Sequence, residues 1–438
     1  MTMNRSGLFR FAAFSAALAG VTACSSDDGP AVRGRKISVL AYGRELVADA
    51  DLKKNWLLTE PETVTAWAQA GGMSHHVMQN PALAPKIMQA WKVNVGRGAE
   101  GKSVLLAEPV GANGIVYTLD SVGRVQALSV SGGKKIFDVL LPKKSVRRIG
   151  AGTGLALDDG RLFAALGTGE VVALDAYNGL ELWRVDLKSP VRSAPAVYGG
   201  RLFVMTADNK LTALAQDDGR TLWDYAAFFE SFSLLGKAAP AIDGGVGVAA
   251  FASGDIVGFR PENGSILWTQ SAGMAKIGDT GSEINDIRAR PVISDDRVFV
   301  VSNGGLLSAL DLKTGGVIWE REIGGVNQPW LAGEVLYVVS SYDELIALEA
   351  VSGKILWINR LTQWRNPEKK KGAVQWTGPV MAGNRLILTN SDGKAIAVAP
   401  QTGTIIGWDD IGAAALSPIV LNDTLFFFTE DGNLTAYR

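Results

Sequence analysis

Cysteine and histidine are nearly missing from this sequence, which has one cysteine and two histidines among 438 residues. A single thiol cannot close an intramolecular disulfide, and the adjacent His75 and His76 have no further Cys or His cluster to complete a metal site. Because no other histidine is present, no Ser-His-Asp set can form in the rest of the chain. We therefore expect no catalytic residues, no metal and no cofactor.

Excess charge and long apolar runs are missing as well. The 43 Lys and Arg residues are balanced by 44 Asp and Glu residues, for a formal net charge of -1. This balance argues against a nucleic-acid-binding protein, which relies on a basic face. No stretch after the N-terminal segment reaches the roughly 18 uninterrupted apolar residues of a membrane-spanning helix. The 51 glycines instead indicate a turn-rich globular protein.

The first residues form a targeting segment. Arg5 and Arg10 make a basic region, and the apolar run from Phe11 to Val21 is too short to span a bilayer. Cys24 follows small residues, and the whole segment closely resembles a bacterial lipoprotein signal. We expect residues 1–23 to be removed and a lipid such as palmitate to be attached at Cys24. An ordinary secretory signal followed by an incidental cysteine is the alternative.

The residues after Cys24 suggest where the protein resides. Ser25-Ser26 lacks the Asp that the lipoprotein resemblance associates with retention at the inner membrane. This favours the periplasmic face of the outer membrane, with the chain anchored by lipid and not spanning the bilayer.

Residues 24–85 are expected to form a tether and a leader segment. Ile37 to Leu40 is compatible with a short strand, and residues 51–67 with a helical turn. The segment from Trp67 to His76 is expected to pack against the domain that follows.

A repeat dominates the rest of the chain. Residues 309–319 read as strand, tight turn and strand, ending in Trp319. Tryptophan-type positions recur at a spacing of about 45 residues, which is typical of four-stranded propeller blades. The eight positions are Trp91, Phe137, Trp183, Trp223, Trp268, Trp319, Trp357 and Gly407, with Trp408 one residue late.

A second pattern alternates with the first and supplies the other two strands. A Pro or Gly precedes a short apolar run, a polar turn and another apolar run. These positions are Pro109, Gly154, Pro195, Pro240, Pro291, Pro329, Pro379 and Pro418. In the third clear copy the four runs are 194–197, 201–206, 211–215 and 221–225, separated by Gly, Asn and Asp residues that favour tight turns. Each repeat is therefore predicted to be a four-stranded antiparallel meander.

The two chain ends predict how the ring closes. Residues 434–438 match the third strand of a repeat, and Trp91 has no first three strands before it. The strand around Trp91 is expected to complete the last blade and remove an open edge. We therefore predict an all-β fold, an eight-bladed β-propeller of four-stranded antiparallel blades over residues 86–438.

The recurring tryptophans are predicted to be structural. Burying an indole removes roughly 150–250 Å² from water, and each has an apolar residue before it. We expect Trp91, Trp183, Trp223, Trp268, Trp319 and Trp357 to pack between blades near the Gly-containing turns. A row of exposed aromatic residues that stack on a ligand is the alternative.

Variation in loop length indicates which face could bind a partner. The connections between blades vary in length, and 223–240, 268–291 and 357–379 are long. Long connections in an otherwise economical fold are often functional. The first carries large apolar residues that suit a partner, or that could plug the channel. The third contains Lys369 to Lys371, which we interpret as a solvated loop.

The Ala-Leu-Asp-x-x-x-Gly-x-x-Leu/Ile-Trp repeat resembles that of quinoprotein-type propellers. Two families share it: the pyrroloquinoline-quinone-dependent dehydrogenases, and BamB, a lipoprotein of the outer-membrane β-barrel assembly machinery. The length of the chain, the lack of an adjacent cysteine pair and the lipoprotein signal favour BamB.

The BamB resemblance implies a non-enzymatic scaffold that binds a POTRA domain of BamA through long loops on one face. The family's Leu-Ser-Leu-Arg-Gly stretch corresponds to residues 232–236, and its Asp-Val-Asp stretch to residues 286–288. The implied partner-binding residues are Phe232, Leu234, Leu235, Asp286 and Arg288. Nascent outer-membrane proteins are further possible partners, through strand augmentation. A quinone-dependent periplasmic oxidoreductase and a cell-wall-binding propeller remain the alternatives.

Overall fold

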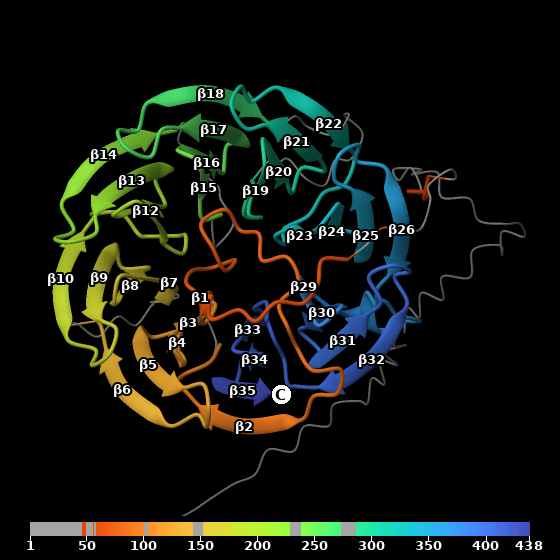
Figure 1. The fold of residues 1–438 in the computed structure, drawn as a ribbon, viewed down its shortest axis with the longest axis horizontal. Coiled ribbons are helices and arrows are strands. Elements are labelled where there is room, and N and C mark those ends of the chain that lie inside the picture. Colours follow the sequence, from red (N-terminus) through yellow and green to blue (C-terminus); the bar gives the residue numbers. More distant parts are fainter. Residues whose placement is uncertain are drawn as a thin grey trace, which may run out of the picture. The chain divides into compact units, whose positions relative to one another are not determined.

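The computed structural model describes residues 46–49, 56, 58–99, 104–142, 152–227, 238–272 and 286–438. Residues 45–438 belong to one compact unit, and the description below concerns that unit alone. Its described residues form strands and no helix, in eight four-stranded antiparallel sheets arranged around a ring (Figure 1). This confirms the predicted all-β, eight-bladed propeller. The expected helical turn in residues 51–67 is absent from the described residues 58–67, which instead end in β1 (Ala66–Trp67).

The first four blades follow the chain in order. Blade 1 contains β3 (Val110–Ala112), β4 (Ile115–Leu119), β5 (Arg124–Ser129) and β6 (Lys135–Leu140), with β1 added beside β3. Blade 2 contains β7 (Gly152–Asp158), β8 (Arg161–Leu166), β9 (Glu170–Asp175) and β10 (Glu181–Asp186). Blade 3 contains β11 (Ala196–Tyr198), β12 (Arg201–Met205), β13 (Lys210–Ala215) and β14 (Thr221–Ala226). Blade 4 contains β15 (Ala241–Asp243), β16 (Val246–Ala250), β17 (Asp255–Phe259) and β18 (Ile266–Ser271).

The other four blades complete the ring. Blade 5 contains β19 (Val292–Ser294), β20 (Arg297–Val301), β21 (Leu307–Asp311) and β22 (Val317–Arg321). Blade 6 contains β23 (Trp330–Ala332), β24 (Val335–Val339), β25 (Glu344–Glu349) and β26 (Ile355–Arg360). Blade 7 contains β29 (Trp376–Ala382), β30 (Arg385–Asn390), β31 (Lys394–Val398) and β32 (Ile405–Asp410). Blade 8 contains β33 (Ile419–Leu421), β34 (Thr424–Phe428), β35 (Asn433–Tyr437) and β2 (Gln89–Asn94), while β27 (Trp364–Asn366) and β28 (Lys371–Ala373) form a separate hairpin.

The outer strand of blade 8 comes from the start of the propeller sequence. β2 pairs antiparallel with β35, the last strand of the chain, with Trp91 opposite Ala436 and Val93 opposite Leu434. The backbone groups of Met88 and Arg438 exchange two further hydrogen bonds. Blade 8 therefore has no tight turn between its third and fourth strands, because β2 precedes β35 by more than 300 residues in the sequence.

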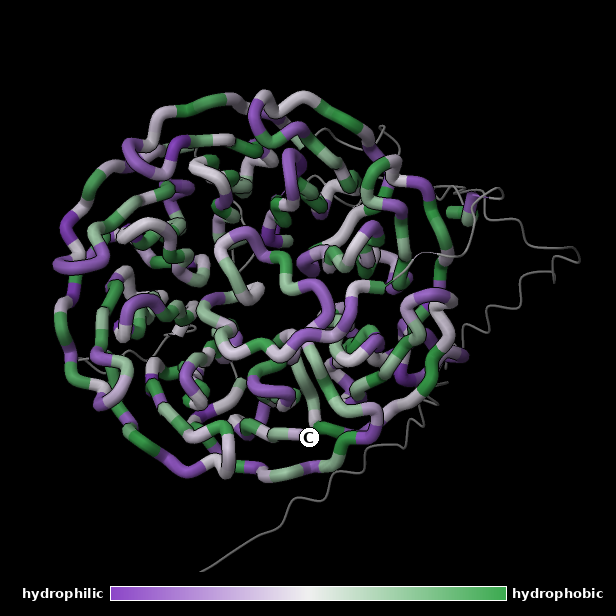
Figure 2. The backbone as a smooth tube through the Cα atoms, viewed as in Figure 1, coloured by the Kyte–Doolittle hydropathy of each residue, from purple (hydrophilic) through white to green (hydrophobic). Residues whose placement is uncertain are grey.

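The hydrophobic pattern explains the radial packing. The second and third strands of each blade are almost entirely buried, since both of their faces contact neighbouring blades. The fourth strands alternate between exposed and buried residues and form the rim of the ring. Figure 2 shows hydrophobic residues concentrated on the strands, with hydrophilic residues at the turns. The interior is therefore a series of clusters between adjacent blades.

Each indole at the repeat position lies at a boundary between two blades. Trp319 of blade 5 donates its Nε1–H to the carbonyl of Ala350 in blade 6, at 3.0 Å. A Cβ atom on Gly353 would lie 2.6 Å from the Trp319 ring, so only glycine fits at that turn. Equivalent glycines contact the aromatic ring of the preceding blade at Gly133, Gly179, Gly219, Gly264, Gly315 and Gly403.

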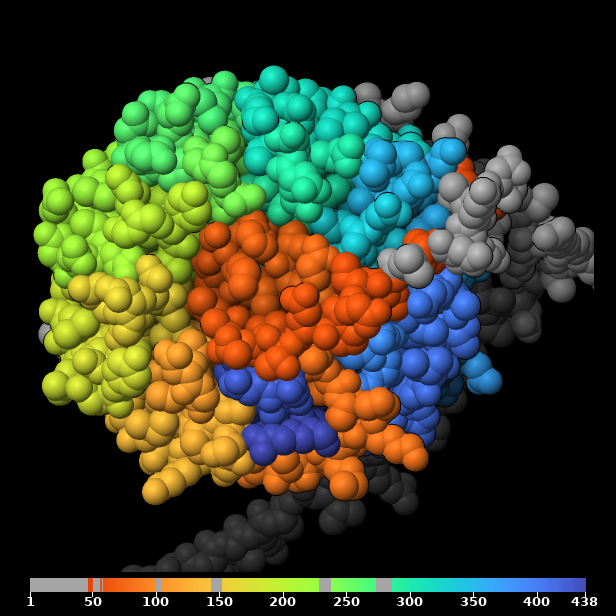
Figure 3. Space-filling view, viewed as in Figure 1, coloured from red at the N-terminus to blue at the C-terminus, as the bar shows by residue number. Residues whose placement is uncertain are grey.

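The leader segment runs once around the inside of the ring. Its residues 64–81 contact the first strand, or the turn after it, in every blade, starting at blade 8 and ending at blade 7. Figure 3 shows this segment spread across the centre of one face. The contacts are Val64 O with Asn422 N, Ala66 with Ala112, Ala68 O with Leu157 N, Gln69 Oε1 with Val197 N, Ser74 O with Ile242 N, His75 O with Ile293 N, Gln79 Oε1 with Gly333 N, and Pro81 O with Gly383 N.

These contacts give a partner to N–H groups on the innermost strands, which have no further strand beside them. Trp67 is buried in the same place and stacks on Trp330 of blade 6, with ring centroids 6.2 Å apart. The leader therefore fixes all eight blades to one segment and covers one mouth of the ring.

Candidate docking face

The propeller has two faces with different features. First-to-second turns lie at the face that the leader covers, since the leader contacts residues such as Gly333 and Gly383 within those turns. Strands alternate in direction, so the connections from one blade to the next leave from the opposite face. The described residues at which blades 3 and 4 end, Ala227 and Ala272, are therefore at the face away from the leader. We call this opposite face the docking face.

Only part of the predicted partner site falls within the described residues. Phe232, Leu234 and Leu235 lie outside them, as does Cys24. Asp286 and Arg288 are described, and they lie just before β19 at the entrance to blade 5. The described residues of blade 3 end at Ala227 and those of blade 4 end at Ala272, and these two blades are neighbours in the ring.

The segment 286–288 combines a buried anchor with a half-buried charge. Ile287 is fully buried in the cluster between blades 4 and 5, and Asp286 is also buried. The Asp286 carbonyl accepts a hydrogen bond from Asn303 N at 3.2 Å, which fixes the backbone. Burial lowers the pKa of Arg288, an effect that the charge of Asp286 partly offsets. Within the described residues, no hydrogen bond or ion pair involves the Arg288 guanidinium, which is half-buried near the charge of Asp286.

A second polar group links opposite sides of the ring. Arg290 Nη2 donates to Glu108 Oε1 at 2.7 Å, which joins blade 5 to blade 1. The Arg290 Nε–H donates to Gln328 Oε1 at 2.5 Å, and Gln328 Nε2 donates to the His76 carbonyl at 3.1 Å. This network connects the leader to the strands at the centre of the ring.

His76 is held neutral within this network. Burial, and then the nearby Arg290 charge, lower its pKa to about 3. A neutral ring that lies 2.7 Å from the Pro291 carbonyl must carry its proton on Nδ1, which donates that bond. His76 therefore has a positioning role between leader and propeller. Its neighbour His75, also with a pKa lowered by burial, accepts a hydrogen bond from Val77 N at its Nδ1.

Sequence reasoning missed Glu108, Arg290 and Gln328. Each directly precedes the proline of its repeat, and most repeats have a small residue at that place. A polar residue at an otherwise small position was a signal, but the repeat pattern cannot show which blades face each other across the ring.

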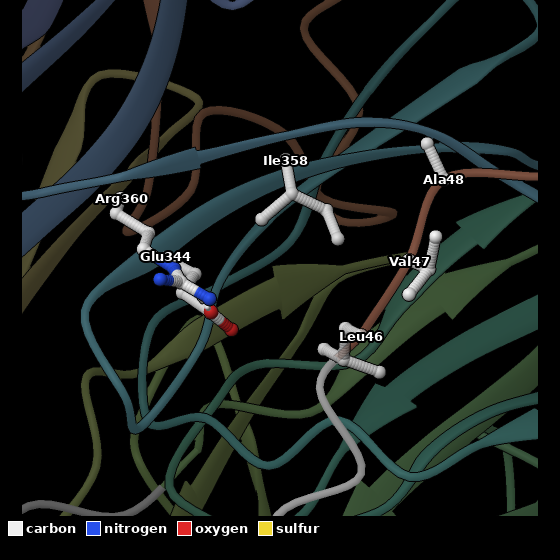
Figure 4. Close-up of a pocket in the computed structure, with 6 residues that line it drawn as sticks. All are labelled: Leu46, Val47, Ala48, Glu344, Ile358 and Arg360. Carbon is white, nitrogen blue, oxygen red and sulfur yellow. Dashed lines mark ion pairs between the residues drawn. The ribbon is translucent and has the colours of Figure 1, made fainter. Parts of the chain in front are cut away.

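Two cavities lie near the leader. One is an open cavity of about 670 Å³, lined by residues from the stretches 59–66 and 73–80, among them Met73 and His75. The other, of about 400 Å³, lies beside blade 6 and is shown in Figure 4. It is lined by Leu46, Val47, Ala48, Glu344, Ile358 and Arg360.

The residues at the centre do not fit a quinone with its metal ion. Among the described residues, no group of three His, Cys, Asp or Glu side chains is placed to hold a metal. The Arg290–Glu108 ion pair crosses the ring, and the leader covers one mouth. In the same described residues, we find no helix with the length and apolar character needed to cross a bilayer.

Comparison with known proteins agrees with this geometry. The family described as "Outer membrane protein assembly factor BamB" matches residues 121–359, more than half of the chain. The β-propeller domain of glucose, ethanol and alcohol dehydrogenases matches residues 321–420. The chain is similar to the BamB proteins of Yersinia pestis, at 26% identity over 80% of this chain and 88% of the relative, and of Escherichia coli K12, at 26% identity over 79% and 87%.

Solved structures support the same fold. The BamB structure from Moraxella catarrhalis has a TM-score of 0.68 and 21% identity, covering 81% of this chain and all of that one. A europium-containing methanol dehydrogenase reaches a TM-score of 0.67, at only 14% identity, over 83% of this chain and 89% of that chain. The shared propeller does not separate the two classes, whereas the family match and the sequence identities do. The chain belongs to the family of the outer membrane protein assembly factor BamB.

Proposed function

We propose that this protein is a lipid-anchored, non-enzymatic subunit of the outer-membrane β-barrel assembly machinery, which binds a POTRA domain of BamA through the docking face. Lipid at Cys24 holds it at the periplasmic side of the outer membrane. Its role is to help outer-membrane proteins to fold and insert. The names of its relatives, which describe outer membrane protein assembly, support this role.

The observation that carries the docking proposal is the position of Arg288. This half-buried guanidinium lies just before β19, where the chain enters blade 5, on the face that the leader leaves open. The connection that enters blade 4 carries Phe232, Leu234 and Leu235. A partner surface with an apolar patch and a carboxylate would suit these apolar residues and this cation.

Co-purification from membranes tests this proposal. The double change Phe232→Ala and Leu234→Ala is expected to lower the recovery of BamA while the melting temperature changes little. Arg288→Glu is expected to lower recovery as well, and Arg288→Lys to retain most of it, because a carboxylate repels the partner charge. Unchanged recovery in the Phe232 and Leu234 variant would remove this face from the interaction.

A matched control lies on the opposite face. Tyr177 and Leu180 are exposed apolar residues at the turn between β9 and β10, on the leader side. Changing both to alanine removes similar apolar area from the surface, and we expect BamA recovery to stay at the wild-type level.

A further inference from the structure

The outer strands of the blades have free edges, and one of them is covered. The first two residues of the fourth strand are exposed or half-exposed in seven blades. In β26 of blade 6 they are buried, with Ile355 at 5% and Leu356 at 9% exposure. Residues 46–49 of the same chain run beside this strand (Figure 4). Blade 6 therefore shows how an extended segment covers such an edge.

The contact at blade 6 uses backbone groups and a carboxylate. Asp49 N donates to the Ile355 carbonyl at 2.9 Å, and Ile355 N donates to Asp49 Oδ2 at 2.7 Å. Leu46 packs against the cluster that contains Ile355, together with Ile358. An extended segment with apolar residues followed by a carboxylate thus satisfies both the polar and the apolar parts of the edge.

Blade 7 repeats the features of this edge. Ile405 and Ile406 occupy the places of Ile355 and Leu356, as the strand registers show. Residue 358 of blade 6 is Ile, and the equivalent residue of blade 7 is Trp408. The same position in the other blades carries charged or polar residues: Asp138, Arg184, Asp224, Thr269, Glu320 and Lys92.

The floor of the blade 6 cavity also has a counterpart in blade 7. Glu344 and Arg360 are opposite each other and form an ion pair at 3.8 Å. Lys394 and Asp410 occupy the same two places and form an ion pair at 3.3 Å. Lys394 Nζ lies 4.7 Å from the centre of the Trp408 ring, which holds the indole against the strand.

The blade 7 edge differs in being uncovered. Ile405, Ile406 and Trp408 are 47%, 55% and 66% exposed. Outside its own sheet, the backbone of Ile405 makes no hydrogen bond within the described part of the chain. Three large apolar residues on one free strand edge are a feature that soluble proteins normally avoid.

The exposed tryptophan follows from how the ring closes. In the other blades the aromatic ring at this position, an indole or the phenyl ring of Phe137, packs over a glycine in the third-to-fourth turn of the next blade. Blade 8 has no such turn, because its fourth strand, β2, comes from the start of the propeller sequence and not from the residues that follow β35. An indole at position 407 would have no turn to cover. Gly407 stands there instead, and Trp408 points from the other face of the strand.

We propose that the outer edge of blade 7, formed by β32, binds an extended segment of an unfolded outer-membrane protein by strand addition. The segment carries apolar residues followed by a carboxylate, as residues 46–49 do at blade 6. Its apolar side chains cover Ile405, Ile406 and Trp408, and its carboxylate accepts from the Ile405 N–H. This inference rests on the proposed role in outer-membrane protein assembly and adds a client site to it.

The test uses the purified full chain and two fluorescent peptides. One has the sequence of residues 44–51, and the other is a strand from an unfolded outer-membrane barrel protein. Ile405→Ser with Ile406→Ser is expected to weaken binding of both peptides at least about tenfold. Ile266→Ser with Leu267→Ser makes the same change at the equivalent positions of blade 4, and it should leave binding unchanged. A photocrosslinking residue at position 406 should form an adduct with the bound peptide.

Several results would overturn the proposal. Equal affinity in the blade 7 variant and the wild type, or equal losses in the blade 4 and blade 7 variants, would show that this edge is not the site. A dimer that dissociates in the blade 7 variant would show that a second copy occupies it. Failure of the docking proposal stays separate, because the blade 7 variant should retain BamA, whereas Phe232→Ala with Leu234→Ala should retain peptide binding.

Discussion

Replacing Trp319 by alanine tests the packing that closes the ring. The Trp319 indole is 8% exposed, donates to the Ala350 carbonyl and contacts Phe299 at a centroid distance of 6.0 Å. Burial of this side chain contributes on the order of 4–6 kcal/mol as an upper limit. Substitutions of buried aromatic residues by alanine cost about 3–5 kcal/mol, and we expect a loss of unfolding free energy in that range.

Urea unfolding followed by circular dichroism measures this loss. With a slope of about 3 kcal/mol per molar urea, the midpoint should fall by about 1–1.7 M. Trp408→Ala is the control, since the same residue type is removed from an exposed site, and the expected change is below about 0.5 kcal/mol. If Trp319→Ala lost less than about 1 kcal/mol, or no more than Trp408→Ala, the indole would not be part of a packed boundary between blades.

The remaining predictions concern the glycines and the central network. Gly353→Ala should be more destabilising than Gly200→Ala by about 1–3 kcal/mol, because both have positive φ but only Gly353 lies against an indole; equal urea midpoints would contradict this. Arg290→Met should cost about 3–5 kcal/mol by leaving the Glu108 carboxylate buried and unpaired, and adding Glu108→Gln should recover part of the loss. The unfolded state takes up a proton on His76 near pH 6.5 and the folded state only near pH 3, so stability falls as pH decreases through this window. Between pH 7.5 and 5 the unfolding free energy of the wild type should fall by about 2 kcal/mol more than that of His76→Gln. Equal losses of stability in the two proteins over this pH range would refute the prediction.

The repeat made most of the fold predictable from sequence. The third clear copy was predicted to have strands at 201–206 and 211–215, and the structure has them at Arg201–Met205 and Lys210–Ala215. Alternating side chains and Gly- or Asn-containing turns are local signals, so the strands of each blade can be predicted from the residues of that blade alone. The number of blades then followed from counting copies.

The leader could not be derived in the same way. It has no repeat, and its partners lie far away in the chain, as with His76 and Pro291. Its contacts are mostly to backbone N–H groups, which nearly every residue type has, so the sequence of the partner strands does not reveal these contacts. For this reason the sequence suggested packing against the propeller but not a full circuit of it.

The candidate site was only partly accessible to sequence reasoning. Resemblance indicated residues 286–288, and the structure adds that Ile287 is buried while the Arg288 guanidinium makes no hydrogen bond or ion pair with the described residues. The covered edge of blade 6 and the uncovered edge of blade 7 can be compared only when the pairing of their strands is known. That pairing shows that Ile355 and Ile405 occupy equivalent positions.

Site-specific photocrosslinking in intact cells tests the central claim most directly. A photoreactive residue replaces Phe232 on the docking face or, as a control, Tyr177 on the leader face. We predict an adduct between this chain and BamA from position 232 and none from position 177. No adduct at 232, or equal adducts at both positions, would contradict docking through this face.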